Sequence, residues 1–145
     1  MQYKFIDLDQ QLEADAGVTV SEYFAEYGED AFRRFENQLL KNVDYPENCI
    51  VATGGGAPCY FDNMEFMNNT GITVYIDMPP LALAKRLEHG KHKRPLLRNM
   101  NEEEMTAFIE AKLEERHPFY KQAALSVNGI SITPDQLRAE LMEIG

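Results

Sequence analysis

Residues 51–57 read Val-Ala-Thr-Gly-Gly-Gly-Ala, so three consecutive glycines directly follow a short run of β-favouring residues. Glycine lets a backbone approach a ligand closely, and consecutive amide N–H groups can form a cradle for oxygen anions. The alternative interpretation is a flexible turn without a ligand. A strand that leads straight into three glycines is less common than a lone glycine turn, so the stretch indicates a ligand loop after a buried strand.

Three further β-favouring runs flank this stretch, and helical patterns separate them. The four expected strands cover residues 3–7, 49–53, 73–77 and 125–128. The expected helices cover residues 21–27, 29–43, 79–88, 101–123 and 133–145. Thr19 and Glu22 occupy capping-box positions, and Pro118 predicts a bend or interruption in the fourth helix. Strands that alternate with helices predict parallel βαβ units and an α/β fold.

Size and charge restrict the class of protein. A chain of 145 residues, 44% of them hydrophobic, is long enough for one well-buried core, so we expect a single domain over residues 1–145. The formal net charge of −10 argues against a nucleic-acid surface and against a polybasic membrane patch. No apolar run approaches the roughly 20 residues of a membrane span, so we expect no membrane partner and a cytoplasmic location. Cys49 and Cys59 lack the short spacing of a disulfide framework or metal site.

Charged residues stand in two patterns that fit a ligand site. Asp7 and Asp9 end the first expected strand, at the sheet edge where ligands bind in open α/β folds. Their alternative role is to cap the following helix. Arg33 and Glu36 lie three residues apart, hence on one helix face, either as an exposed salt bridge or as an arginine oriented by a glutamate to bind a carboxylate.

Two basic stretches follow in the second half of the chain. Residues 91–98 read Lys-His-Lys-Arg-Pro-Leu-Leu-Arg between two expected helices. Such a stretch is either a solvated loop or, in a phosphoryl-transfer enzyme, a lid that brings positive charge over the phosphates. Arg116 stands beside Pro118, where a helix interruption would turn it into a cleft.

Taken together, in this order and spacing, the motifs resemble the shikimate kinase family. The match runs through Phe-Ile-Asp-Leu-Asp at 5–9, Gly-Glu-x-x-Phe-Arg-x-x-Glu at 28–36, Ala-Thr-Gly-Gly-Gly-Ala at 52–57, Arg-Pro-Leu-Leu at 94–97 and Glu-Arg-x-Pro-Phe-Tyr at 115–120. The resemblance implies a P-loop kinase fold of the nucleoside-monophosphate-kinase type, with a parallel sheet flanked by helices and a lid around residues 89–101. It also implies transfer of the ATP γ-phosphoryl group to the 3-hydroxyl of shikimate, in aromatic amino acid biosynthesis.

The resemblance assigns the substrate contacts. Asp9 would hold the shikimate hydroxyls and accept the proton of the attacking one, a role that suits a carboxylate within hydrogen-bond reach of the nucleophile. Arg33, oriented by Glu36, and Arg116 would grip the shikimate carboxylate. The amides of Gly54, Gly55 and Gly56 would position the ring.

The resemblance also assigns the phosphate end. Asp7 resembles the aspartate that steadies the Mg²⁺ shell through a bound water, and Arg94 resembles the lid arginine that reaches the transferring phosphate. Arg86 and the loop over residues 128–134 would pack the adenine of ATP. Mg²⁺ and an arginine both stabilise the negative charge on the transferring phosphate. This stabilisation supplies most of the rate of phosphoryl transfer.

One family feature is absent from these 145 residues, because no Gly-x-x-x-x-Gly-Lys-Ser/Thr stretch occurs in them. In the family this loop cradles the phosphates and follows a central strand. We therefore expect a fold without its first central strand and phosphate loop, and weakened nucleotide binding. A truncated or wrongly assigned start, a removed N-terminus, and a variant that fills the slot by self-association are the three explanations. A complete family member would be a monomer.

Two other functions fit parts of the pattern. A truncated, non-catalytic module that binds shikimate would also retain Asp9, Arg33 and the three glycines, but it has no evident use for Asp7, Arg94 or a lid. A related small-metabolite kinase, such as one for gluconate, shares the fold. Arg33 and Arg116 together with the triple glycine favour shikimate.

Overall fold

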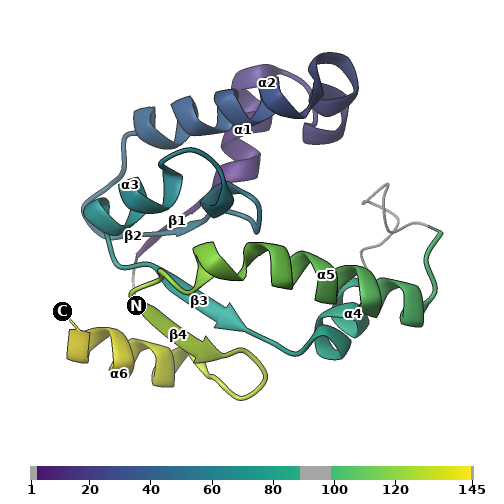
Figure 1. Ribbon diagram of the computed structural model, residues 1–145. Helices are drawn as coiled ribbons and strands as arrows, with labels where there is room; N and C mark the ends of the chain where they lie inside the picture. The colour runs from purple at the N-terminus through teal and green to yellow at the C-terminus, as the bar shows by residue number, and fades with distance from the viewer. Residues whose placement is uncertain (1–2, 89–98, 145) are drawn as a thin grey trace. The chain divides into compact units, whose positions relative to one another are not determined.

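The computed structural model describes residues 3–88 and 99–144 and contains parallel strands flanked by helices (Figure 1). It divides into two compact units, Met1–Gly71 and Ile72–Gly145. Among the described residues the strands form two two-stranded sheets, one in each unit, and both are parallel. The predicted α/β class with parallel strands is confirmed. The single domain and the lack of the family's first central strand stay predictions.

The first unit alternates strands and helices around one apolar cluster. Its elements are β1 (Lys4–Asp7), α1 (Leu8–Ala16), α2 (Val20–Asn42), β2 (Cys49–Ala52), the 3₁₀ turn η1 (Ala57–Cys59) and α3 (Asn63–Thr70). The cluster is built from apolar residues of α1, α2 and η1, namely Leu8, Leu12, Phe32, Leu40 and Ala57. Since α1 packs on α2, the helix that carries Arg33 is fixed next to the end of β1.

The start of α2 and its bend are both explained by particular residues of the sequence. The predicted capping box is confirmed, because the Thr19 hydroxyl accepts from the Glu22 amide while the Glu22 carboxylate accepts from the Thr19 amide. Gly28 interrupts the helix with φ 85° and ψ 171°, a backbone conformation that is essentially restricted to glycine. The two expected helices, 21–27 and 29–43, are therefore the two arms of α2.

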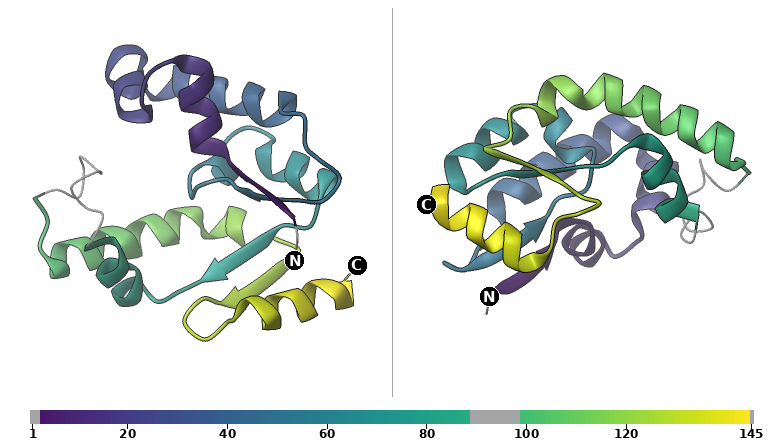
Figure 2. Two further views of the ribbon diagram at one scale, coloured as in Figure 1. Left: turned by 180° about the vertical axis from the view of Figure 1, so that it is seen from behind. Right: turned by 90° about the horizontal axis from the view of Figure 1, so that it is seen from below.

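The second unit has a smaller core between two helices. Its elements are β3 (Val74–Asp77), α4 (Pro80–Glu88), α5 (Glu102–Tyr120), β4 (Leu125–Asn128) and α6 (Pro134–Ile144). Helices α4 and α5 lie side by side in both Figure 1 and Figure 2, and they bury Ala84, Met105 and Ile109. No helix among the described residues has both the length and the apolar character to span a membrane.

Sequence reasoning placed all four strands within one residue of their bounds, and it was wrong about three helical features. It missed α1 and α3, whose helical repeats are short. The interruption expected near Pro118 does not occur, since α5 continues to Tyr120. Pro118 lies in the last turn of the helix, where its missing N–H removes only one hydrogen bond shortly before the helix ends.

Candidate substrate site

The pairing register of β1 and β2 brings Asp9 and Gly54 to the same edge of the sheet. Asp7 lies opposite Ala52 in the parallel ladder, so the residues two positions further along both strands leave the sheet together. A Cβ atom built on Gly54 would lie 3.6 Å from Oδ2 of Asp9. Gly54 has φ 80°, in the left-handed region that favours glycine. The carboxylate of Asp9 is exposed at this edge, where a hydroxyl ligand can reach it.

Arg33 and Glu36 form a buried ion pair on α2. Nη1 of Arg33 donates to Oε1 of Glu36 at 3.1 Å and to Oε2 at 3.4 Å. Their side chains are only 12% and 3% exposed. The alternative of an exposed surface salt bridge is therefore wrong. A buried guanidinium held by a carboxylate on one side is a fixed positive charge with a defined direction.

The guanidinium lies among aromatic rings and against the triple-glycine loop. Cζ of Arg33 is 4.2 Å from the ring centroid of Tyr60, 5.3 Å from that of Phe32 and 5.9 Å from that of Phe24. A Cβ atom at Gly56 would lie 2.6 Å from Nη1 of Arg33. Since Gly54 and Gly56 are two residues apart, the acid Asp9 and the cation Arg33 lie at the two ends of one short loop.

A polar network anchors the segment that follows this loop. Asn63 is fully buried, donates from Nδ2 to the carbonyl of Ala57 at 2.8 Å and accepts from Nδ2 of Asn37 at 2.6 Å. Asp62 accepts from Nζ of Lys41 at 2.8 Å and from Nδ2 of Asn37 at 3.0 Å. These two hydrogen bonds, the one from Lys41 first, lower the pKa of the Asp62 carboxyl. The network fixes the glycine loop to α2, the helix that carries Arg33.

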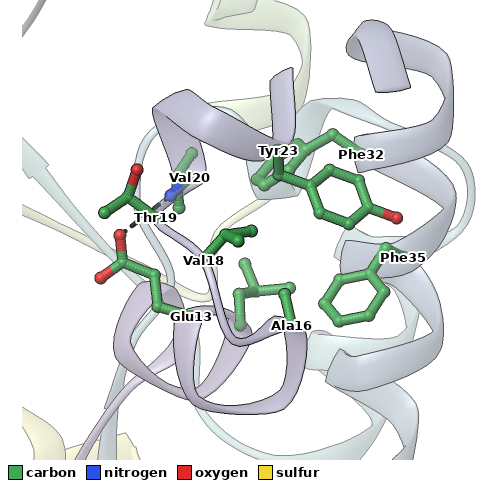
Figure 3. Close-up of a pocket in the computed structure, with 9 residues that line it drawn as sticks. Glu13, Ala16, Val18, Thr19, Val20, Tyr23, Phe32 and Phe35 are labelled. Carbon is green, nitrogen blue, oxygen red and sulfur yellow. Dashed lines mark hydrogen bonds between the residues drawn. The ribbon is translucent and has the colours of Figure 1, made fainter. Parts of the chain in front are cut away.

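Figure 3 shows a small hollow in the first unit that is distinct from this cluster. Apolar side chains of α1 and α2 line it, including Tyr23, Phe32 and Phe35. Its carboxylate, Glu13, accepts a hydrogen bond from the Val20 amide at 2.9 Å and so closes the connection between α1 and α2. Two residues with hydroxyl groups, Thr19 and Tyr23, are among those that line the hollow, and none of the predicted site residues is among them.

Asp7 caps the N-terminus of α1, which was the alternative role considered for the two aspartates. Oδ1 of Asp7 accepts from the amides of Asp9 at 3.0 Å and Gln10 at 3.4 Å. Both bonds use Oδ1, so the cap leaves Oδ2 for another partner. Residues 3–88 and 99–144 contain no cluster of three or more His, Cys, Asp or Glu side chains that would hold a metal ion. Mg²⁺ commonly binds through one or two carboxylates together with waters and phosphates, which fits a single aspartate of this kind.

The remaining predicted residues belong to the second unit. Arg116 is half-buried on α5, and Arg86 on α4 lies with Nη1 3.5 Å from Sδ of Met78. Arg116 belongs to the second unit and Arg33 to the first, and the predicted pairing of the two on one carboxylate stays a prediction. Arg94 and nearly all of the predicted lid, 89–98, lie outside the described residues.

Three residues beside Arg33 were missed by sequence reasoning. Phe24 and Phe32 follow the ordinary apolar repeat of α2, which predicts a core and not a site. Tyr60 stands alone four residues after the last glycine, and nothing in the sequence indicates that its ring covers Arg33. Neither Cys49 nor Cys59 forms a disulfide bond in the part of the chain that the structure describes.

Comparisons with known proteins agree on one family. The family model described as shikimate kinase matches residues 1–144. A shikimate kinase of Parabacteroides distasonis is 51% identical over 122 residues, which are 84% of this chain and 70% of that protein. One of Phocaeicola vulgatus is 48% identical over 123 residues, 85% of this chain and 70% of its own length.

Solved structures give the same result. The crystal structure of shikimate kinase from Bacteroides thetaiotaomicron superposes with a TM-score of 0.85 at 41% identity, over 98% of this chain and 81% of that one. Shikimate kinase from Acinetobacter baumannii in complex with shikimate superposes with a TM-score of 0.75 at 29% identity, over 98% of this chain and 76% of that one. The fold and the family motifs therefore coincide along nearly the whole chain.

Proposed function

Because the chain belongs to the shikimate kinase family, we propose that the cluster of Asp9, Arg33 and Gly54–Gly56 is its shikimate site. Shikimate kinases transfer the γ-phosphoryl group of ATP to a hydroxyl of shikimate, so the site must hold one carboxylate and several hydroxyls. A fixed guanidinium and an exposed carboxylate at opposite ends of a glycine loop supply the two kinds of partner. The complex of the Acinetobacter baumannii enzyme with shikimate supports the choice of ligand.

The observation that carries the proposal is a buried hydrogen-bond donor of Arg33 that has no acceptor among the described residues. Its Nη1 is held by Glu36, whereas its Nε is buried and has no hydrogen-bond partner among the residues that the structure describes. Oε1 of Glu29 is 3.8 Å from Nε, too far for a hydrogen bond. A buried donor without a partner costs about 1 to 3 kcal/mol, which a ligand carboxylate on the Nε edge would recover.

Asp9 is the proposed acceptor of the reacting hydroxyl proton. It is exposed, adjoins Gly54, and lies at the carboxyl end of a parallel strand, where ligands of α/β folds bind. A carboxylate that hydrogen-bonds a hydroxyl orients it for attack and takes its proton as the new bond forms.

The charge of the phosphates requires further groups. Asp7 would hold Mg²⁺ through a bound water with the oxygen that its helix cap does not use, and the ion would supply neutralisation of phosphate charge. Arg94 would act on the transferring phosphate, Arg116 would add a second cation to the shikimate carboxylate, and Arg86 would contact the adenine of ATP. These four roles rest on the match to the family motifs.

An assay for ADP release distinguishes a kinase from a non-catalytic module that only binds shikimate. Release of ADP that depends on shikimate identifies a kinase, whereas shikimate binding without ADP release identifies a non-catalytic module. The relatives reported above are all shikimate kinases, which favours shikimate over gluconate as the acceptor. We also propose a cytoplasmic location, because ATP, the co-substrate of the family, is a metabolite of that compartment.

Calorimetric titration with shikimate tests the site. We expect Arg33→Ala to weaken shikimate binding by at least ~1.5 kcal/mol, because charge-assisted hydrogen bonds to the carboxylate are lost. Gly71→Ala is the control, since nothing lies within 4 Å of a Cβ at that position. Equal affinity of the Arg33→Ala variant and the unmodified chain would remove Arg33 from the site.

A further inference from the structure

Tyr60 covers the face of the Arg33 guanidinium and is itself anchored to α2. Its ring centroid lies 4.2 Å from Cζ of Arg33, the shortest of the three aromatic contacts of that group. Its hydroxyl donates to Oε1 of Glu29 at 2.8 Å. The same Oε1 lies 3.8 Å from Nε of Arg33. Tyr60 and Glu29 therefore form a second support for the guanidinium, separate from Glu36.

The two supports restrain different motions. Glu36 holds one end of the group through Nη1, and a guanidinium held only at this end can still tilt about it. A ring in face contact restricts this tilt, because the planar cation gains most from a ring centred beneath it. The bond from Tyr60 to Glu29 fixes the ring in turn, since Glu29 and Arg33 lie one helical turn apart on α2. The Nε edge is then presented in one direction.

The surroundings of Tyr60 fit this role better than a general packing role. Tyr60 follows η1 and is only half-buried, and it is not a member of the apolar cluster of the first unit. Glu29 is 55% exposed, so its contribution to stability is small. Neither residue belongs to the buried core, yet both contact Arg33, the side chain proposed to bind the substrate carboxylate.

We infer that Tyr60, anchored by Glu29, is a positioning residue that sets the direction of the Arg33 guanidinium toward the substrate carboxylate. The inference rests on the proposed function, because it has an effect on binding only if Arg33 contacts shikimate. Tyr60 would also contribute to specificity. A correctly oriented guanidinium binds a planar carboxylate better than a ligand that offers only a hydroxyl in the same place.

The test compares shikimate affinity, by calorimetric titration, in four variants of the full chain. Tyr60→Leu removes the aromatic face and is expected to weaken binding about three- to tenfold. Tyr60→Phe keeps the ring and removes the hydroxyl that donates to Glu29, so it is expected to weaken binding about two- to threefold, less than Tyr60→Leu does. Tyr45→Leu is the matched control, because Tyr45 is a half-buried tyrosine of the same unit that bonds the Leu40 carbonyl. It should lower the unfolding temperature without changing shikimate affinity.

Arg33→Ala, the fourth variant, separates failure of the inference from failure of the proposed function. If Arg33→Ala loses affinity while Tyr60→Leu binds within about twofold of the unmodified chain, the positioning role is overturned and the site stands. If Arg33→Ala retains full affinity, the proposed site itself is wrong. Should Tyr60→Leu fail to fold, Glu29→Ala replaces it, because this change at an exposed residue removes the carboxylate that anchors Tyr60. An unchanged affinity of Glu29→Ala then overturns the inference, and a loss of at least about twofold supports it.

Discussion

The guanidinium of Arg33 lies directly against the backbone of Gly56. A Cβ atom at that position would be 2.6 Å from Nη1, 2.7 Å from Nη2 and 3.0 Å from Cζ. Real Cβ atoms essentially never approach other atoms so closely. Arg33 therefore occupies the space that a side chain at residue 56 would need, and any larger residue there must displace the guanidinium.

Gly56→Ala is expected to displace the guanidinium while leaving the core intact. Shikimate affinity should fall by about tenfold or more, since the charge-assisted bonds to the carboxylate are misdirected. The free energy of unfolding should change much less, because the displaced atoms are the end of a side chain. Titration calorimetry and urea unfolding measure the two effects, with Gly71→Ala as the control. Unaltered affinity in Gly56→Ala would show that Arg33 does not act from its observed position.

Removal of Glu36 is expected to destabilise the fold and the site together. Glu36→Ala leaves the buried charge of Arg33 without its carboxylate and should lower the free energy of unfolding by about 3 kcal/mol. Glu115→Ala is the matched control, because Glu115 forms an exposed pair with Lys112 at the same helical spacing. That change should cost below about 1 kcal/mol. Urea unfolding measures both, and equal costs would contradict the buried character of the Arg33 pair.

Gly28 is expected to be intolerant of a side chain for conformational reasons alone. Nothing lies within 4 Å of a Cβ built there, but its φ of 85° with ψ of 171° is strained for any other residue. Gly28→Ala should therefore lower the free energy of unfolding by about 1 to 3 kcal/mol. Thermal and urea unfolding check this value. A variant as stable as the unmodified chain would mean that α2 does not need its kink.

The contribution of Asp62 to stability is expected to disappear in acid. Hydrogen bonds from Lys41 and Asn37 lower its pKa in the folded state below the ordinary value of 3.8. A group with a lowered folded pKa stabilises the fold above its unfolded pKa, and this contribution is lost as the pH falls through the folded pKa. The stability difference between the unmodified chain and Asp62→Asn should thus be constant near neutrality and shrink below 3.8. A difference that persists unchanged to lower pH would contradict the bonding at Asp62.

The strands and the family were predictable from the sequence because both depend on local information. Short β-favouring runs ended by polar residues and glycines gave β1 to β4, and the order of the motifs gave the shikimate kinase family. The capping box of Thr19 and Glu22 followed from spacing alone. The helix α1 was missed because its charged sequence, Leu-Asp-Gln-Gln-Leu-Glu-Ala-Asp-Ala, has only a short apolar repeat, and its cap at Asp7 was considered only as an alternative.

The surroundings of Arg33 were not predictable, because they depend on contacts between distant segments. Glu36 follows from helical spacing, but its burial does not. Tyr60 is 27 residues from Arg33 in the chain and reaches it only because the loop after β2 folds over α2. The hydrogen bonds from Asn37 to Asp62 and Asn63 hold that loop in place, and the sequence does not predict them either.

A crystal structure of this chain with shikimate decides whether Arg33 and Asp9 hold the substrate. We expect a shikimate carboxylate oxygen within about 3 Å of Nε of Arg33, and a ring hydroxyl within hydrogen-bond distance of Asp9. Nη1 would remain bonded to Glu36, as it is in the free chain. Shikimate bound elsewhere, with Nε of Arg33 still lacking a partner, would contradict the proposed site.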